Sequence, residues 1–186
     1  MKRIFDFTMA LILMAIMALP IAILAILVKL TSPGPAIYWS DRVGQKNKNF
    51  LMPKFRTMHK DSPEVATHLL QNAENYLTPF GSFLRRNSLD ELPQLWSVLK
   101  GDMSFVGPRP ALFNQDDLIK LRTEKEIYKL LPGITGWAQI NGRDDIPIPI
   151  KVLYDEYYLK NQSFFFDLKI LRDTFLKVIK KEGVIH

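Results

Sequence analysis

One apolar run near the N-terminus constrains this chain more than any other feature. From Phe7 to Leu30 the sequence reads FTMALILMAIMALPIAILAILVKL, in which Thr8 and Lys29 are the only strongly polar side chains. A helix of that length extends about 36 Å, against a hydrocarbon core of roughly 30 Å. The run therefore predicts a membrane segment. A cleaved secretory signal fits less well, because the run is too long and no small-residue cleavage site follows it.

Pro20 lies near the middle of this run. A proline there removes one backbone hydrogen bond and predicts a kink between two half-helices of about 13 and 10 residues, each too short to cross a bilayer alone. Positive charge flanks the run on both sides, at Lys2, Arg3 and Lys29, and such charge favours the cytoplasmic face. A re-entrant hairpin that enters and leaves on one side and a kinked transmembrane span both fit these residues.

The turn cluster TSPGPAIY separates this segment, residues 1–31, from a second unit, residues 32–186. Short apolar runs around the turn-rich stretch VGQKNKN predict a small strand element over 36–56. LPQLWSVLKGD predicts a helix that ends at Gly101 and has one apolar face, formed by Leu92, Leu95, Trp96 and Leu99. The Gly- and Pro-rich stretches FVGPRPAL and LLPGITGWAQINGRDDIPIPI predict loops. The expected fold class is mainly α with a small β element.

The C-terminal stretch SFFFDLKILRDTFLKVIKKEGVIH predicts an amphipathic helix. Its apolar residues follow one helical face, namely Phe164, Leu168, Leu171, Phe175 and Val178. Such a face fits two arrangements, packing on the domain core or lying in the lipid interface. The same aromatics could meet a second copy of the chain, so a homodimer stays open.

The chain carries a net charge of +6 and no cysteine. The absence of cysteine excludes disulfides and thiolate metal sites. The basic charge suits nucleic acid, anionic lipid or a phosphorylated substrate. A nucleic-acid-binding domain would leave the apolar run unexplained, so no nucleic-acid partner is expected, whereas membrane phospholipid is.

An acidic pair, Asp90 and Glu91, lies in the stretch RRNSLDELPQ. Ser88 and Glu91 have the spacing of a capping box. Pro93 cannot donate the backbone hydrogen bond that a helix begun at Ser88 requires, so the regular helix is expected to start later, with Pro93 in its first turn. In either case the pair lies at a helix N-terminus, which favours anions, including phosphate. Adjacency alone carries no signal, because acidic pairs also occur at 116–117, 144–145 and 155–156.

Two carboxylates would repel a bound diphosphate unless cations intervene. Mg²⁺ held by Asp90 and Glu91 would solve that problem, and arginines would hold the phosphates bidentately. The candidates are Arg85, Arg109 and Arg143, of which Arg109 is restricted by a proline on each side. A carboxylate beside a metal-bound diphosphate can attack phosphorus and form an acyl phosphate.

Five segments together carry a resemblance to a known family: KRIFDF, VKLTSPGPAIY, KFRTM, SLDELPQLWSVLKGDMSFVGPRP and PGITGWAQINGR. In this order they resemble the bacterial sugar transferase family, the monotopic phosphoglycosyl transferases, over nearly the whole chain. The resemblance implies transfer of a phosphosugar from a UDP-sugar to a polyprenyl phosphate such as undecaprenyl phosphate, with release of UMP. It places the protein in the bacterial inner membrane, with the catalytic domain on the cytoplasmic face.

The resemblance also implies roles for individual residues. Asp90 would be the nucleophile that forms the phosphosugar-enzyme intermediate, and Glu91 would help to hold Mg²⁺. The matching phosphate-binding positions are Arg85, Arg109 and Arg143, and Lys54 and Arg56 of KFRTM either assist them or serve the structure. The family implies the re-entrant hairpin with its break at Pro20. N-acetylated hexosamines are the leading donor sugars. The alternative function is a membrane-tethered module that binds nucleotide or anionic lipid without chemistry and needs no acid at position 90.

Overall fold

The computed structural model describes residues 1–59, 62–63, 73–142 and 146–180. Helices make up most of this part of the chain and two small sheets complete it, which confirms the predicted fold class. The first helix, α1 (Lys2–Thr31), covers the predicted membrane segment. Within the described residues, α1 alone is long and apolar enough to cross a membrane, with a mean hydropathy of 3.1 in its most apolar window.

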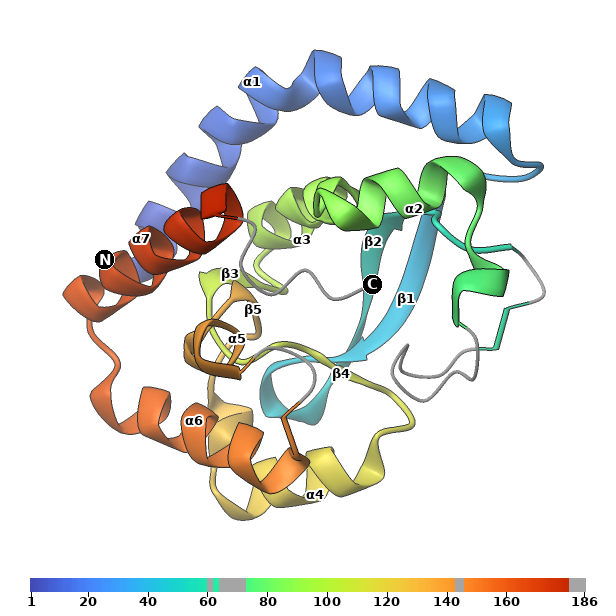
Figure 1. Cartoon of the computed structure of the whole chain (residues 1–186). Coiled ribbons are helices and arrows are strands. Elements are labelled where there is room, and N and C mark those ends of the chain that lie inside the picture. Colours follow the sequence, from blue (N-terminus) through green and yellow to red (C-terminus); the bar gives the residue numbers. More distant parts are fainter. Residues whose placement is uncertain (60–61, 64–72, 143–145, 181–186) are drawn as a thin grey trace.

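Pro20 lies inside α1, and the helix continues through it. Figure 1 shows that α1 changes direction near its middle and arches over α2 (Pro79–Arg86) and α3 (Leu95–Lys100). A proline removes one hydrogen bond of the helix, and the bonds on either side of it can still hold the two arms together. The predicted break is thus a bend within one helix, and the re-entrant course stays a prediction.

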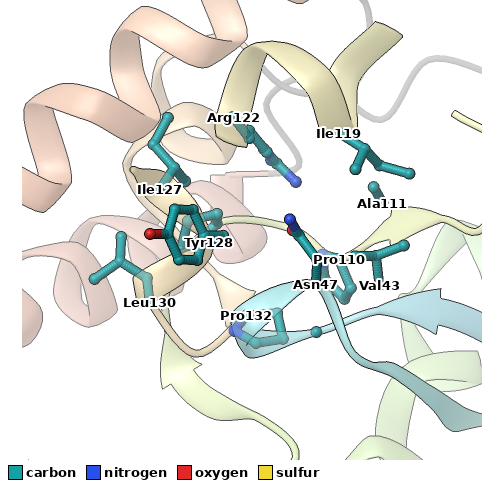
Figure 2. A pocket seen from close by; sticks show the side chains of 12 residues that line it. Val43, Asn47, Pro110, Ala111, Ile119, Arg122, Ile127, Tyr128, Leu130 and Pro132 are labelled. Carbon is teal, nitrogen blue, oxygen red and sulfur yellow. The ribbon is translucent and has the colours of Figure 1, made fainter. Parts of the chain in front are cut away.

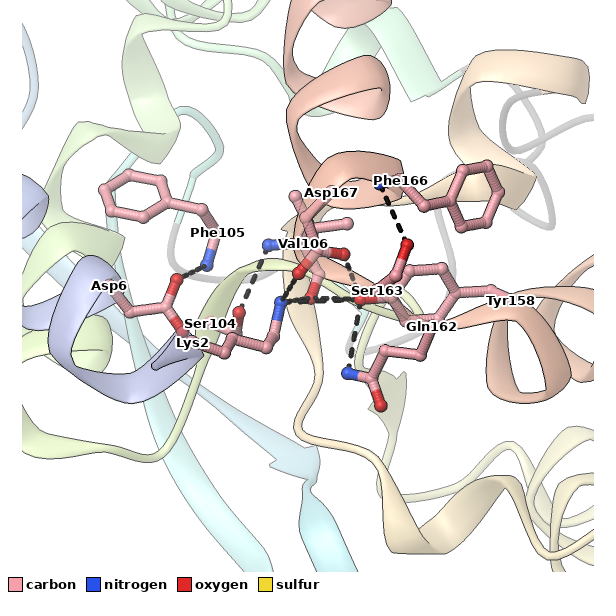
Figure 3. A network of polar contacts seen from close by, with 10 residues as sticks. All are labelled: Lys2, Asp6, Ser104, Phe105, Val106, Tyr158, Gln162, Ser163, Phe166 and Asp167. Atoms are coloured by element: carbon pink, nitrogen blue, oxygen red, sulfur yellow. Dashed lines mark hydrogen bonds and ion pairs between the residues drawn. The ribbon is translucent and has the colours of Figure 1, made fainter.

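A polar network fastens the N-terminal end of α1 to the rest of the protein (Figure 3). Lys2 Nζ donates to Asp167 Oδ2 at 2.5 Å, and the Tyr158 hydroxyl donates to the other oxygen of Asp167 at 2.6 Å. One turn further along α1, Asp6 accepts a hydrogen bond from the Phe105 amide. Both carboxylates are buried, where charge-assisted hydrogen bonds of this kind are strong.

The C-terminal end of α1 is attached to the same unit by different contacts. Val28 is buried in a small apolar cluster with Phe55 and Leu84. Ser32 directly follows the helix. Arg56 donates from Nη2 to the Ser32 hydroxyl at 2.6 Å and to the Ser32 carbonyl at 2.8 Å. The two ends of α1 are therefore both tied to the folded part of the chain that follows it.

The predicted strand element is present as an antiparallel hairpin. Strand β1 (Ile37–Val43) pairs with β2 (Asn49–Phe55), and β4 (Ala111–Leu112) adds to the other side of β1 in the order β2-β1-β4. The connecting turn contains a short 3-10 helix (Gln45–Asn47) in which Lys46 and Asn47 have positive φ. The polar turn predicted from VGQKNKN is thus confirmed.

Two short parallel strands, β3 (Ser104–Val106) and β5 (Gly133–Thr135), lie where the sequence predicted loops. Glycine permits this pairing, because a Cβ on Gly133 would lie 2.1 Å from the Gly107 nitrogen. The prediction of loops here was wrong because it took these glycines as turn signals. They instead let two backbones approach closely.

The remaining helices surround these sheets. They are α4 (Asp116–Glu124), α5 (Trp137–Gly142), α6 (Ile148–Asn161) and α7 (Phe164–Lys180), with short 3-10 helices at Ala73–Tyr76, Leu89–Gln94 and Ile127–Lys129. Helix α3 ends at Gly101, as predicted, with φ of 95° in the left-handed region. Trp96, predicted on the packed face of α3, is half exposed, and Val98 is buried in its place.

Helix α7 is amphipathic as predicted, but most of its predicted apolar face points away from the core. Phe164, Leu168, Phe175 and Val178 are exposed, whereas Leu171 packs against the core. Between residues 164 and 178 of α7, the buried positions are Asp167 and Ile170. Asp167 points inward to meet Lys2 and Tyr158, and with that orientation of the helix Phe164 and Phe165 face outward.

Candidate active site

The acidic pair lies in the first turn of the 3-10 helix Leu89–Gln94, which leads directly into α3. Ser88 precedes this helix with φ of 54°, in the left-handed region, and its side chain caps nothing. An N-cap serine needs an extended backbone, so the capping box that the spacing of Ser88 and Glu91 allowed does not form. Asp90 is buried, with 8% of its surface exposed.

Glu91 forms ion pairs with two cations that are distant from it in the sequence. Lys54 Nζ, from β2, lies 2.9 Å from Glu91 Oε1, and Arg109 Nη2 lies 3.1 Å from the same oxygen. Burial raises the pKa of Glu91, but the charges of Lys54 and Arg109 outweigh it and hold that pKa well below its usual range. Burial lowers the pKa of Lys54, and the two carboxylates oppose that shift.

Asp90 has a different environment. Among the described residues, no side chain or amide donates a hydrogen bond to its carboxylate. Burial is the largest influence and leaves the pKa of Asp90 above its usual value, with Glu91 adding to the rise and the charge of Lys54 opposing it. Arg85 and Arg109 also lower it. The Asp90 oxygens are thus held among cations with their lone pairs available for a ligand or for an attack on phosphorus.

Arg85, at the end of α2, is positioned by a residue that the sequence analysis did not single out. Its Nε donates to the Thr57 hydroxyl at 2.9 Å. Thr57 is buried, and its carbonyl accepts from the Thr78 amide at the start of α2. Thr57 belongs to the KFRTM segment, so the same segment that supplied Lys54 contained the signal for it.

The structure brings together five of the seven predicted site residues, which are Lys54, Arg85, Asp90, Glu91 and Arg109. Arg56 is directed elsewhere, because its Nη2 is engaged with Ser32 at the end of α1. That contact favours the structural role that was left open for it. Arg143 lies outside the described residues.

The loop that carries Arg109 is held by its backbone. Pro108 and Pro110 have no amide hydrogen to donate, and all three successive carbonyls, of residues 108 to 110, accept hydrogen bonds. Their donors are the Gly133 amide at 2.9 Å, Arg122 Nη1 at 2.8 Å and Arg42 Nη1 at 3.2 Å, in chain order. The guanidinium of Arg109 therefore starts from a fixed backbone.

The donor set fits a hard divalent cation. Both ion pairs of Glu91 end on Oε1, and Oε2 accepts no hydrogen bond from the described residues. The described residues contain no cluster of three or more acidic or histidine side chains placed to hold one metal ion. Mg²⁺ commonly takes only one or two carboxylates and completes its shell with water and substrate phosphate, so Asp90 and Glu91 are the residues that could hold it.

Comparison with known proteins defines the class of this protein. The family model described as bacterial sugar transferase matches residues 1–181. The chain therefore belongs to the bacterial sugar transferase family. This confirms the resemblance drawn from the five sequence segments.

Named relatives extend this result. The chain is 44% identical over 186 residues to the uncharacterized sugar transferase EpsL of Bacillus subtilis, a match that covers 99% of this chain and 90% of EpsL. It is 39% identical to UDP-glucose:undecaprenyl-phosphate glucose-1-phosphate transferase of Escherichia coli, covering 97% of this chain and 40% of that protein. It is 36% identical to UDP-N-acetylgalactosamine-undecaprenyl-phosphate N-acetylgalactosaminephosphotransferase of Aeromonas hydrophila, covering 92% and 43%. The chain thus spans about two-fifths of these last two relatives.

Proposed function

We propose that this protein is a phosphoglycosyl transferase that moves a sugar phosphate from a UDP-sugar to undecaprenyl phosphate and releases UMP. One observation carries the proposal. The Asp90 carboxylate is buried among three cations and accepts no hydrogen bond from the described residues, while the neighbouring Glu91 is engaged by Lys54 and Arg109. The names of the relatives support the class of donor and acceptor.

In the first step, an oxygen of the Asp90 carboxylate attacks the sugar-bearing phosphorus of the UDP-sugar. The bond from that phosphorus to the bridging oxygen breaks, its electron pair leaves with UMP, and the sugar phosphate remains on Asp90 as an acyl phosphate. In the second step, a phosphate oxygen of undecaprenyl phosphate attacks the same phosphorus. The carboxylate of Asp90 is released, and the product is a polyprenyl diphosphate sugar.

The cations of the site hold the diphosphate and stabilise the charge that develops on it. Arg109 and Arg85 present planar donor forks suited to phosphate oxygens, and Lys54 adds a point charge. Glu91 keeps Lys54 and Arg109 in place while no substrate is bound. Asp90 and Glu91 would hold Mg²⁺, whose charge would offset that of the phosphate oxygens.

The donor sugar is proposed to be an N-acetylated hexosamine. The relatives' names include glucose and galactose beside N-acetylgalactosamine, so family membership alone does not select the sugar. Discrimination depends on the shape of the pocket and on a few hydrogen bonds to the sugar. The assay below therefore includes donors of each kind.

We further propose that α1 is re-entrant and that residues 32–186 lie on the cytoplasmic face of the inner membrane. Two observations support this. Both ends of α1 are tied to one unit, Lys2 to Asp167 and Val28 to the cluster around Phe55. At the N-terminal end, Phe5 packs edge-on against Phe164 of α7, so the exposed face of α7 continues from the membrane helix. That face then lies in the lipid interface.

The test measures UMP release by the full chain in nanodiscs with undecaprenyl phosphate and Mg²⁺. The donors are UDP-GlcNAc, UDP-GalNAc, UDP-diacetylbacillosamine, UDP-glucose and UDP-galactose. We expect one of them to support turnover that requires Mg²⁺ and falls at least about a thousand-fold in Asp90→Asn. Without acceptor, mass spectrometry should find the sugar phosphate on the peptide that contains Asp90.

The matched control is Asp116→Asn, which changes an exposed acid at the start of α4 and should leave the rate unchanged. Turnover by Asp90→Asn at the wild-type rate would rule out Asp90 as the nucleophile. Donor binding without turnover by the wild type would instead favour the non-catalytic binding module.

A further inference from the structure

Arg122 and Asp155 form a buried ion pair behind the candidate active site. Arg122 lies in α4 and Asp155 in α6, and their side chains are 10% and 2% exposed. Arg122 donates from Nε at 3.0 Å and from Nη2 at 2.7 Å, both to Asp155 Oδ2. The pair fixes the plane of the guanidinium and leaves its third nitrogen, Nη1, to reach another group.

That third nitrogen donates to the backbone carbonyl of Arg109 at 2.8 Å. Arg109 is the residue whose side chain reaches Glu91 at 3.1 Å, so one hydrogen bond separates the buried pair from the phosphate-binding cations. A planar fork can serve Asp155 and the carbonyl together, whereas the ammonium group of a lysine cannot reproduce that geometry.

Arg122 and the Arg109 loop meet in the wall of one pocket. Pro108, Pro110 and Arg122 all line it, and both prolines are buried. Figure 2 shows Arg122 pointing from α4 toward Pro110 and Asn47. The loop is therefore held by the packing of its two prolines and by the hydrogen bond from Arg122 to the carbonyl between them.

We propose that Arg122, held by Asp155, is a positioning residue. It fixes the backbone of Arg109 and thereby places the Arg109 guanidinium for contact with the donor diphosphate. The proposal rests on the proposed transferase function. Arg122 touches neither Asp90 nor Glu91 among the described contacts and acts through the backbone of Arg109. A buried ion pair by itself adds little to stability, because well-packed apolar side chains often replace one without loss.

The first test needs no substrate. Hydrogen–deuterium exchange is followed in the peptide that spans residues 104–112, in which Gly107 and Arg109 carry the amides beside the two prolines. R122K keeps a charge opposite Asp155 and removes the fork, and we expect it to raise the exchange rate of this peptide about tenfold. E156Q is the matched control, because Glu156 follows Asp155 on α6 and pairs with Lys125 at the end of α4 without touching Arg109.

The second test is a double-mutant cycle on UMP release with whichever donor the wild type uses. We expect R122K and R109A each to lower kcat/KM about 10- to 100-fold, and R122K to cause no further loss when combined with R109A. If R122K fails to fold, R122M combined with D155L replaces the pair with apolar side chains of similar size.

An unchanged exchange rate in R122K would overturn the inference. A double mutant whose loss of kcat/KM equals the product of the two single-mutant losses would also overturn it. The exchange result stands whether or not any donor is turned over. It therefore separates a failure of this inference from a failure of the proposed function.

Discussion

Lys54 Nζ lies 2.9 Å from Glu91 Oε1, an ion pair that joins the end of β2 to the turn that carries Asp90. Arg109 reaches the same oxygen, and Arg85 stands close enough for its charge to act on both carboxylates. Three cations therefore surround two carboxylates. A site with an excess of positive charge is suited to a diphosphate, and removing one cation should change how Asp90 ionises.

Lys54→Met should move the acid limb of the pH–rate profile to higher pH. Asp90 must be ionised to attack phosphorus, and the charge of Lys54 lowers its pKa. Without that charge the pKa of Asp90 rises, so activity is lost at a higher pH as the solution is acidified. The measurement is kcat/KM against pH. Lys54→Arg keeps the charge and should retain the acid limb of the wild type. If the acid limbs of Lys54→Met and Lys54→Arg coincided, the prediction would be contradicted.

Arg56→Met should destabilise the protein more than it affects the chemistry. The side chain is buried and its Nη2 donates twice to Ser32, and losing such charged hydrogen bonds costs about 1.5 to 3 kcal/mol. Thermal unfolding should show a lower Tm, while UMP release by the folded fraction stays within about threefold of the wild type. Arg85→Met should instead lower UMP release, because it removes a cation of the site, and its Tm should fall less, because it loses one hydrogen bond, to Thr57, and not two. A stable but inactive Arg56→Met protein would instead support phosphate binding by Arg56.

The two ends of α1 should be accessible from the same side of the membrane. The chain has no cysteine, so single cysteines report cleanly. One is placed in a short tag before Met1 and another at Lys46, in the turn between β1 and β2. Neither should react with a membrane-impermeant maleimide in intact cells, and both should react in inverted vesicles. Labelling of the tag from outside the cell would show that α1 spans the membrane.

The outward face of α7 should contact lipid. A fluorophore attached at Phe165→Cys, where the native side chain is 81% exposed, should be quenched by lipids that carry spin labels in their acyl chains. The control is Lys120→Cys on α4, which Figure 1 places on the opposite side of the molecule from α1. Equal quenching at both positions would mean that α7 has no preferred contact with the membrane.

Local signals in the sequence predicted local structure well. The turn that contains Asn47 and the end of α3 at Gly101 follow from residue types that favour positive φ, and the structure confirms both. Ser88 also has positive φ, but a serine gives no such signal and its spacing to Glu91 pointed to a capping box instead. Trp96 was misplaced because helical spacing cannot show which side of a helix the neighbouring elements cover.

The acidic pair and its arginines could be proposed from their chemistry, but Lys54 could be predicted only through the resemblance to a family. Lys54 and Arg109 lie 37 and 18 positions from Glu91, and no spacing rule connects them. Asp155 is a second residue whose position could not be predicted from spacing. It belongs to one of the acidic pairs that adjacency could not distinguish, and only the structure shows that it is buried against Arg122.

The attachment of Lys2 to Asp167 has a consequence for the order of events during biosynthesis. The two residues are 165 positions apart, so α1 leaves the ribosome long before its partner on α7 exists. The first arm of α1 must wait in or near the membrane until nearly all of the protein has been translated. The contact that closes this end of the structure is therefore among the last to form, and truncation within α7 should leave the N-terminus unattached even when α1 has already entered the lipid.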